Sequence, residues 1–311
     1  MSNQIVCLMG PTASGKTDLA CELVRRFPFE IVSVDSALIY KEMNIGTAKP
    51  NSELLEKAPH HLIDFLNPDQ SYSAANFCED AIAVCKKILS SNKIPLLVGG
   101  TMMYFNALQQ GLSNLPEANE EIRNALLKEA QQHGWEFLWN QLKQVDPMSA
   151  NKIHPNDTQR IQRALEVYKI TGQPLSHLLG KETKLPYRYI NILLIPEDRA
   201  WLHKRIALRL DEMLAQGFIK EVEDLHKKWQ LNSHYPSMRT VGYRQAISYL
   251  EGEGDFAEFR EKAIVATRQL AKRQITWLRH WNEGTVLHPE NKNVLHELVE
   301  IAQQIVDNSS Q

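Results

Sequence analysis

The apolar positions of the chain fall into two kinds of pattern. Four short apolar runs, at residues 5–9, 31–34, 94–98 and 189–195, are bounded by polar or turn-forming residues and are typical of buried strands. Apolar residues at helical spacing separate these runs, most clearly over residues 74–90. Strands that alternate with helices predict an α/β fold, in which a parallel sheet is flanked by helices.

The pattern changes between residues 116 and 185. This stretch has no strand-like run, and the dipeptides Leu115-Pro116 and Leu185-Pro186 bracket it. Helical spacing covers residues 120–132, 135–144 and 157–171. We therefore predict an all-helical insertion at 116–185 within an α/β core that is formed by residues 1–115 and 186–311.

A long helix is predicted near the C-terminus, from Glu258 to about Trp281. At about 100° per residue, two sets of its side chains fall on roughly opposite faces. The apolar set is Ala263, Ala266, Leu270, Trp277 and Trp281, and the basic set is Arg268, Lys272 and Arg279. We expect the apolar face to pack in the core. The basic face would form a ridge suited to the phosphate backbone of RNA, unless it is only a solvated surface.

Composition limits the class of protein only slightly. The 311 residues are 43% hydrophobic, and the formal net charge of -2 gives no overall signal for nucleic-acid binding. The four cysteines show no C-x-x-C spacing, which favours a reduced, cytoplasmic protein. No apolar stretch approaches the roughly 18 residues that cross a membrane, and the short N-terminal run is unlike a signal peptide.

A phosphate-binding motif directly follows the first apolar run. It is the P-loop pattern G-x-x-x-x-G-K-[ST], present as Gly10-Pro11-Thr12-Ala13-Ser14-Gly15-Lys16-Thr17. Strand, glycine-rich turn and helix occur in the required order, so a chance match is the weaker interpretation. Backbone N–H groups and Lys16 would hold phosphate, and the Thr17 hydroxyl would hold Mg²⁺. The motif does not reveal which phosphate compound binds.

Two further strand ends carry candidate chemistry. Asp35 follows the run at 31–34, and Gly99-Gly100-Thr101 closes the run at 94–98. In open α/β sheets, ligands bind at the carboxyl ends of the strands, which predicts that Asp35 lies near the P-loop. The alternative is an aspartate that only caps a turn. P-loop ATPases usually have an acidic Mg²⁺ ligand where Gly99 and Gly100 stand, so a nucleotide-hydrolysing motor is disfavoured.

Arginines at helical spacing mark other candidate anion contacts. Arg160 and Arg163 share a face of the helix at 157–171, and Arg205 and Arg209 share a face of the helix after the run at 189–195. The segment 239–244 combines two arginines with a glycine and a tyrosine. Each of these sets is also compatible with a solvated surface.

Assembled along the chain, these motifs closely resemble the bacterial tRNA dimethylallyltransferase family. The matching stretches in the N-terminal half are the P-loop, Val34-Asp35-Ser36-Ala37-Leu38-Ile39-Tyr40, Gly46-Thr47-Ala48-Lys49-Pro50, Pro59-His60-His61-Leu62-Ile63-Asp64 and Val98-Gly99-Gly100-Thr101. Those in the C-terminal half are residues 157–166, Val241-Gly242-Tyr243-Arg244 and residues 267–274. They span nearly the whole chain in order, and the combination is specific.

The resemblance implies transfer of a dimethylallyl group from dimethylallyl diphosphate to N6 of the adenine 3′-adjacent to the anticodon in tRNA. It implies Asp35 as general base, with Thr101, Lys16 and Arg209 acting on a diphosphate in a reused P-loop, and Mg²⁺ on Thr17. The insertion would bind the anticodon stem-loop, and a cytoplasmic monomer is expected. The implied tRNA contacts are Asp35, Ser36, Ala37, Leu38, Thr101, Arg123, Gln159, Arg160, Ile161, Gln162, Arg163, Arg239, Thr240, Val241, Gly242, Tyr243, Arg244, Lys272, Arg273, Gln274 and Arg279.

Two other functions remain open at this point. A small-molecule or nucleoside kinase would use the same P-loop for ATP and Asp35 as base toward a hydroxyl. A non-catalytic RNA-binding protein would keep the loop as a structural nucleotide site. The sequence also leaves open which tRNAs are modified, the oligomeric state, the metal preference and the order of substrate binding. It does not decide whether Arg205 or Arg209 contacts the diphosphate.

Overall fold

The computed structural model describes residues 3–111, 113, 115–179, 186–231 and 235–309. The chain divides into two compact units, one made of Met1–Ala107 and Pro186–Gln311 and the other of Leu108–Leu185. The first boundary comes at Leu108 and not at residue 116, where the sequence pattern changes. In the described residues, no helix is both long and apolar enough to cross a bilayer.

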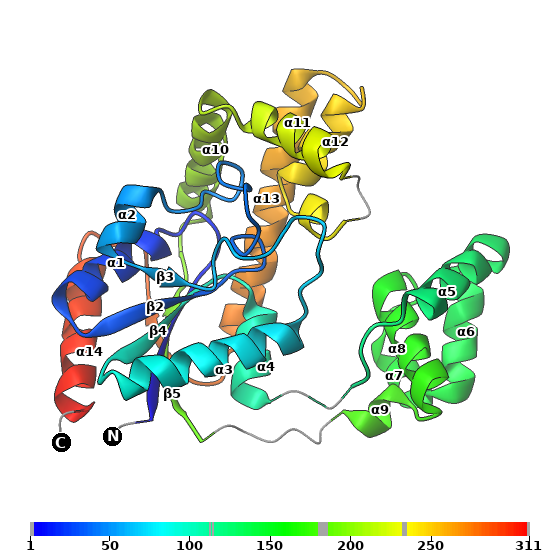
Figure 1. Cartoon of the computed structure of the whole chain (residues 1–311), viewed down its shortest axis with the longest axis horizontal. Coiled ribbons are helices and arrows are strands. Elements are labelled where there is room, and N and C mark those ends of the chain that lie inside the picture. Colours follow the sequence, from blue (N-terminus) through cyan, green and yellow to red (C-terminus); the bar gives the residue numbers. More distant parts are fainter. Residues whose placement is uncertain (1–2, 112, 114, 180–185, 232–234, 310–311) are drawn as a thin grey trace. The chain divides into compact units, whose positions relative to one another are not determined.

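A parallel sheet forms the middle of the larger unit (Figure 1). In the described residues its six strands lie in the order β3-β2-β4-β1-β5-β6. Their bounds are β1 Gln4–Met9, β2 Phe29–Val34, β3 His60–His61, β4 Ile94–Gly99, β5 Arg188–Leu194 and β6 Thr285–Leu287. The four predicted runs are β1, β2, β4 and β5. The short edge strands β3 and β6 were not predicted, because two or three residues show no periodicity.

Helices cover both faces of this sheet, which confirms the predicted α/β class. Their bounds are α1 Lys16–Arg26, α2 Ser52–Lys57, α3 Ala74–Ser90, α4 Met102–Gln110, α10 Arg199–Ala215, α11 Phe218–Trp229, α12 Tyr243–Leu250, α13 Phe256–Arg279 and α14 Val294–Ser309, with a 3₁₀ turn at Ser237–Arg239. Side chains cap the N-termini of several of these helices. Ser73 and Asn76 form a capping box at α3, and the Asp198 carboxylate accepts a hydrogen bond from the Ala200 N–H at the start of α10.

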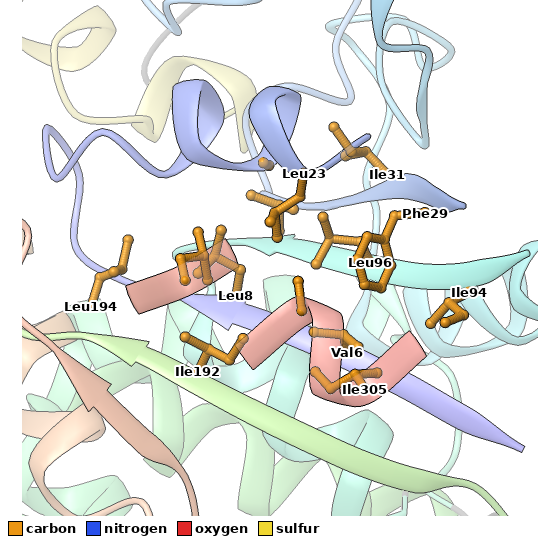
Figure 2. Packing of buried hydrophobic residues seen from close by; sticks show 14 of the residues in the cluster. Val6, Leu8, Leu23, Phe29, Ile31, Ile94, Leu96, Ile192, Leu194 and Ile305 are labelled. Atoms are coloured by element: carbon orange, nitrogen blue, oxygen red, sulfur yellow. The ribbon is translucent and has the colours of Figure 1, made fainter. Parts of the chain in front are cut away.

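The main core lies between one face of the sheet and helices α1 and α14 (Figure 2). Alternate residues of each central strand point to this face, as the period of a strand requires. They include Val6 and Leu8, Ile31, Leu96 and Ile192, and they meet Leu23 of α1 and Ile305 of α14. The strand β1 is buried on both faces, which is why it reads as a continuous apolar run. This packing fixes the end of β1 from which the P-loop starts.

A second cluster joins α10, α11, α12 and α13 to the segment after β2. In α13 the buried residues include Phe259, Ala263, Ile264, Ala266 and Ala271. The predicted apolar stripe is therefore wrong in part. Leu270 is only half-buried, Trp277 is 45% exposed, and Trp281 lies beyond the end of the helix. The helix packs through a neighbouring face, and the Leu270–Trp277 side faces a cavity described below.

The smaller unit contains only helices in its described part: α5 Glu120–His133, α6 Trp135–Val145, α7 Pro147–Lys152, α8 Thr158–Thr171 and α9 Leu175–Leu178. Its core is formed by apolar residues of α5, α6 and α8, with Leu126, Leu138, Leu142 and Ile161 fully buried. These elements agree with the predicted all-helical insertion. Ile161 was predicted to contact tRNA, and this is a correction: its side chain fills the core and is fully buried.

Candidate active site

A cavity of about 490 Å³ lies in the larger unit at the carboxyl ends of β1, β2 and β4. The P-loop, the segment 35–38 and residues 98–103 form one side of it. The segments 46–48 and 239–242 and the helices α10, α11 and α13 form the other. Every element of this wall belongs to the larger unit. The volume is in the range of about 300–1,000 Å³ that is usual for small-molecule sites.

The P-loop has the geometry of an anion site. Helix α1 begins at Lys16 after Gly15, which has a φ of 86° that favours glycine, and no side chain caps this end. The N–H groups of the first turn are therefore free to meet an anion. Gly10 is also required by packing, because a Cβ there would lie 2.9 Å from the Leu194 Cβ. The loop stands where strand order and helix start together predicted it.

Two of the cations that line this cavity, Lys16 and Arg209, lie next to the charge of Asp35. The Lys16 Nζ donates to the Pro11 carbonyl at 2.7 Å. Burial lowers the pKa of Lys16 to about 7, while nearby Asp35 opposes the decrease and Arg209 adds to it. Burial also lowers the pKa of Arg209, with Asp35 again opposing. A guanidinium stays charged despite such a decrease, whereas an amine loses much of its charge near neutral pH.

The structure distinguishes Arg205 from Arg209, which both lie on α10. Arg209 lines the cavity, and its Nη2 donates to the Thr47 carbonyl at 3.2 Å. Arg205 is exposed; its Nε donates to the Ala13 carbonyl at 2.8 Å, and its guanidinium lies 5.0 Å from the centre of the Trp201 ring. Arg209 is thus the one of these two arginines that faces the cavity, and Arg205 contacts the P-loop from outside the cavity lining.

Asp35 and Thr101 meet because β2 and β4 are neighbours in the sheet. The Asp35 Oδ1 accepts hydrogen bonds from the N–H groups of Ala37 at 2.8 Å and Leu38 at 3.4 Å. The Thr101 Oγ1 accepts from the Ser36 N–H at 3.1 Å. Asp35 therefore organises a turn, as the alternative interpretation proposed, and it also lines the cavity with Thr101. The two roles are compatible because a carboxylate has a second oxygen.

Gln274 of α13 connects the P-loop to the end of β4. Its Oε1 accepts from the Thr12 N–H at 2.9 Å, and its Nε2 donates to the Gly100 carbonyl at 2.8 Å. A Cβ on Gly100 would lie 2.4 Å from that Nε2, and one on Gly99 would lie 2.0 Å from the Val34 carbonyl oxygen. These glycines allow protein segments to approach each other closely. Gln274 was predicted to contact tRNA, but its amide is engaged by these two backbone groups.

The other predicted RNA contacts of the larger unit divide into three groups. The first lines the cavity: Ser36, Ala37, Leu38, Arg239, Thr240, Val241, Gly242 and Arg273. The second, Arg244, Lys272 and Arg279, is exposed and outside the cavity lining. The third group is Tyr243 alone, and here the predicted tRNA contact is wrong. Tyr243 is fully buried, and its hydroxyl donates to the Glu221 Oε1. It stabilises the second core cluster and has no surface to offer a nucleic acid.

The arginines of the smaller unit are organised around a buried carboxylate. Glu166 of α8 is fully buried, and it accepts from Arg123 Nε at 2.8 Å, Arg163 Nη1 at 2.7 Å and the Asn119 N–H at 2.8 Å. Burial raises the pKa of Glu166, but these hydrogen bonds outweigh it and hold the pKa below its usual value. The Gln162 amide donates to the Arg123 carbonyl at 3.1 Å. Arg123 and Arg163 thus have a structural role, which the sequence pattern did not reveal.

Two predicted contacts of the smaller unit stay on its surface. Gln159 is exposed, and Arg160 is 70% exposed in its side chain with a 3.4 Å ion pair to Asp157. Sequence reasoning missed Glu166, although its place three residues after Arg163 was a signal for pairing. It also missed Glu221 and Thr47, whose partners are distant in the chain, so that no local pattern marks them.

A P-loop, a carboxylate and apolar side chains in one cavity define a class of protein, an α/β enzyme for a phosphate ester with an apolar part. Comparison with known proteins gives the family. The family model described as IPP transferase matches residues 38–281. The tRNA dimethylallyltransferase of Legionella pneumophila (strain Paris) is 56% identical over 310 residues, 99% of each chain. That of Coxiella burnetii (strain RSA 493) is 53% identical over 298 residues, 95% of this chain and 96% of the relative.

Solved structures agree. The tRNA isopentenylpyrophosphate transferase of Bacillus halodurans is 32% identical with a TM-score of 0.71, and the alignment covers 99% of this chain and 98% of that one. A eukaryotic dimethylallyltransferase that acts on tRNA has the same fold, with a TM-score of 0.84 at 24% identity over 99% of this chain and 80% of that one. The chain therefore belongs to the tRNA dimethylallyltransferase family and is a prenyltransferase. The family resemblance inferred from the motifs is confirmed.

Proposed function

We propose that the protein transfers the dimethylallyl group of dimethylallyl diphosphate to N6 of the adenine 3′-adjacent to the anticodon in tRNA and releases diphosphate. The observation that carries this proposal is the composition of the cavity. A phosphate-binding loop, a carboxylate and a set of apolar side chains converge in it. The apolar side chains come from α4, α10 and α13: Met102, Met103, Ile206, Leu210, Leu270 and Trp277. They suit a five-carbon chain and keep water from an allylic centre that it would hydrolyse.

The nucleophile needs help from a base. The N6 lone pair of adenine is delocalised into the ring, so the amine attacks only as its proton is removed. In the proposed step, N6 forms a bond to C1 of the dimethylallyl group while the bond from C1 to the diphosphate oxygen breaks. The proton of N6 passes to the Asp35 carboxylate, which lines the cavity beside Thr101.

The leaving diphosphate gains negative charge as that bond breaks. Lys16, Arg209 and the open N-terminus of α1 would stabilise this charge, and the Thr101 hydroxyl would donate to the bridging oxygen. The Thr17 hydroxyl lines the same cavity, and such a hard oxygen donor fits Mg²⁺ bound mainly through substrate phosphates. Bound there, Mg²⁺ would supply further charge neutralisation. Among the described residues, no cluster of three histidine, cysteine or acidic side chains offers a separate metal site.

Exposed cations beside the cavity support tRNA as the acceptor. Lys272 and Arg273 are consecutive exposed residues of α13, and Arg273 also lines the cavity. Phosphate contacts of this kind position an RNA without reading its sequence. The target base would have to leave its stack to reach Asp35, which costs a few kcal/mol.

The test is mass analysis of nucleosides from unmodified tRNA that has been incubated with the protein and dimethylallyl diphosphate. We expect N6-dimethylallyladenosine at the position after the anticodon and an equal amount of diphosphate. Replacement of dimethylallyl diphosphate by ATP tests the kinase alternative. Phosphate transfer from ATP without any prenylated nucleoside would refute the proposal.

A further inference from the structure

A second anion-binding turn lies beside the cavity, and the protein fills it with its own carboxylate. Glu221 of α11 accepts hydrogen bonds from three successive backbone N–H groups. The distances are 2.8 Å from Asn44, 2.7 Å from Ile45 and 3.1 Å from Gly46. Successive N–H groups that converge in this way favour a negative charge, as they do in a P-loop.

Aromatic packing fixes the same turn from its other side. The buried Tyr243 hydroxyl donates a fourth hydrogen bond to Glu221, at 2.5 Å, and the Tyr243 ring lies edge-on to Phe218 with centroids 5.1 Å apart. A Cβ on Gly46 would lie 2.1 Å from a carbon of the Phe218 ring and 2.7 Å from the Tyr243 ring. The turn 44–46 is therefore packed against α11 and α12, with no room for a side chain at position 46.

The turn leads directly to the diphosphate side of the cavity. Gly46, Thr47 and Ala48 line it, and the Thr47 carbonyl accepts from the Arg209 Nη2 at 3.2 Å. The Thr47 hydroxyl in turn donates to the Met43 carbonyl at 2.7 Å. An unbroken series of contacts thus runs from the Glu221 carboxylate through the turn to the guanidinium that faces the P-loop.

We propose that Glu221 is a positioning residue, which holds the segment 44–48 and through it the guanidinium of Arg209 in the place where the diphosphate leaves. This inference rests on the proposed function. A carboxylate is required because Glu221 only accepts hydrogen bonds, and its two oxygens receive four of them. In Glu221→Gln, an amide N–H would face backbone or hydroxyl donors, and some of the four hydrogen bonds would be lost.

The first test measures kcat/KM for dimethylallyl diphosphate at saturating tRNA. We expect Glu221→Gln to lower it by about 10- to 10²-fold, the cost of misplacing a binding group by roughly 1 Å. Tyr243→Phe keeps the three N–H contacts and should lose less. Glu223→Gln is the matched control: it removes the same charge from α11, and among the described residues Glu223 has no hydrogen bond to the turn. It should behave like the unchanged protein.

A double-mutant cycle with Arg209→Ala separates positioning from general loss of structure. If Glu221 acts through Arg209, Glu221→Gln should cause little further loss of kcat/KM once Arg209 is gone. Thermal unfolding of each variant accompanies the kinetics. The inference is overturned if Glu221→Gln has normal kcat/KM, or if its loss is the same with and without Arg209. An unchanged protein that forms no prenylated tRNA would instead refute the proposed function.

Discussion

Lys16 is half-buried in the wall of the cavity, and this burial lowers the pKa of its ammonium group to about 7. Asp35 opposes the decrease, and Arg209 strengthens it. Without a ligand, the lysine is therefore about half neutral near pH 7 and mostly neutral above that pH. A bound diphosphate brings negative charge next to the ammonium and favours its protonated form. Substrate binding above pH 7 should then be accompanied by proton uptake.

This gives a pH dependence with a definite sign. From pH 7.5 to 9, the affinity for dimethylallyl diphosphate should fall, because binding requires a proton that becomes scarcer; the limit is about tenfold per pH unit. Calorimetry at pH 8 in buffers with different ionisation enthalpies measures the uptake directly. Lys16→Arg, which stays charged, should take up far fewer protons. Equal uptake by both proteins would mean that another group titrates.

The structure also gives some single residues roles that their identity and place in the sequence do not reveal. Gln274 and Tyr243 both lie in stretches that resemble RNA-contacting segments, yet one clamps the P-loop and the other stabilises the core. Their partners, Thr12 and Glu221, are distant in the sequence, so no local spacing indicates them. Lys16, Thr17 and Asp35 were predictable, because a strand followed by a polar turn fixes the edge of the sheet at which they lie.

At the scale of elements, the role of a charged side chain on a helix depends on which other elements pack against that helix. Lys272 on α13 is exposed, whereas Arg123 of α5 and Arg163 of α8 are held by the buried Glu166. Helical spacing marked Lys272 and Arg163 alike as candidate RNA contacts or solvated cations, and it did not show that Arg163 is paired. It also assigned Trp277 to the core of α13, because the period shows which residues share a face but not which neighbour covers it.

Lys272 and Arg123 should therefore respond differently to substitution. Lys272→Ala should reduce the slope of log K for tRNA binding against log salt by roughly 0.7–0.9, with unchanged thermal stability. Arg123→Ala should leave the charge of Glu166 with one arginine fewer and cost roughly 1–3 kcal/mol of stability. Salt titrations and thermal unfolding of both variants are the measurement. If Lys272→Ala leaves the salt slope unchanged, α13 does not lie along the RNA.

At the scale of the whole molecule, the order of the sheet brings distant motifs to one place. The strands β1, β2 and β4 are neighbours, so the P-loop, Asp35 and Thr101 meet at their carboxyl ends although they are far apart in the chain. This much follows from the rules for parallel sheets. The opposite wall is formed by residues 46–48 and 239–242 and by helices α10, α11 and α13, and it depends on tertiary packing that no spacing encodes. It supplies Arg209 and most of the apolar surface.

The most direct test of the account is the single-turnover rate of Asp35→Asn, measured together with its affinity for tRNA. An asparagine oxygen can still accept from the N–H groups of Ala37 and Leu38, so the turn after β2 should persist while the basicity is lost. We predict a rate lower by roughly 10²–10⁴-fold with nearly normal tRNA affinity. A rate close to that of the unchanged protein would contradict the account, because Asp35 could then not be the base.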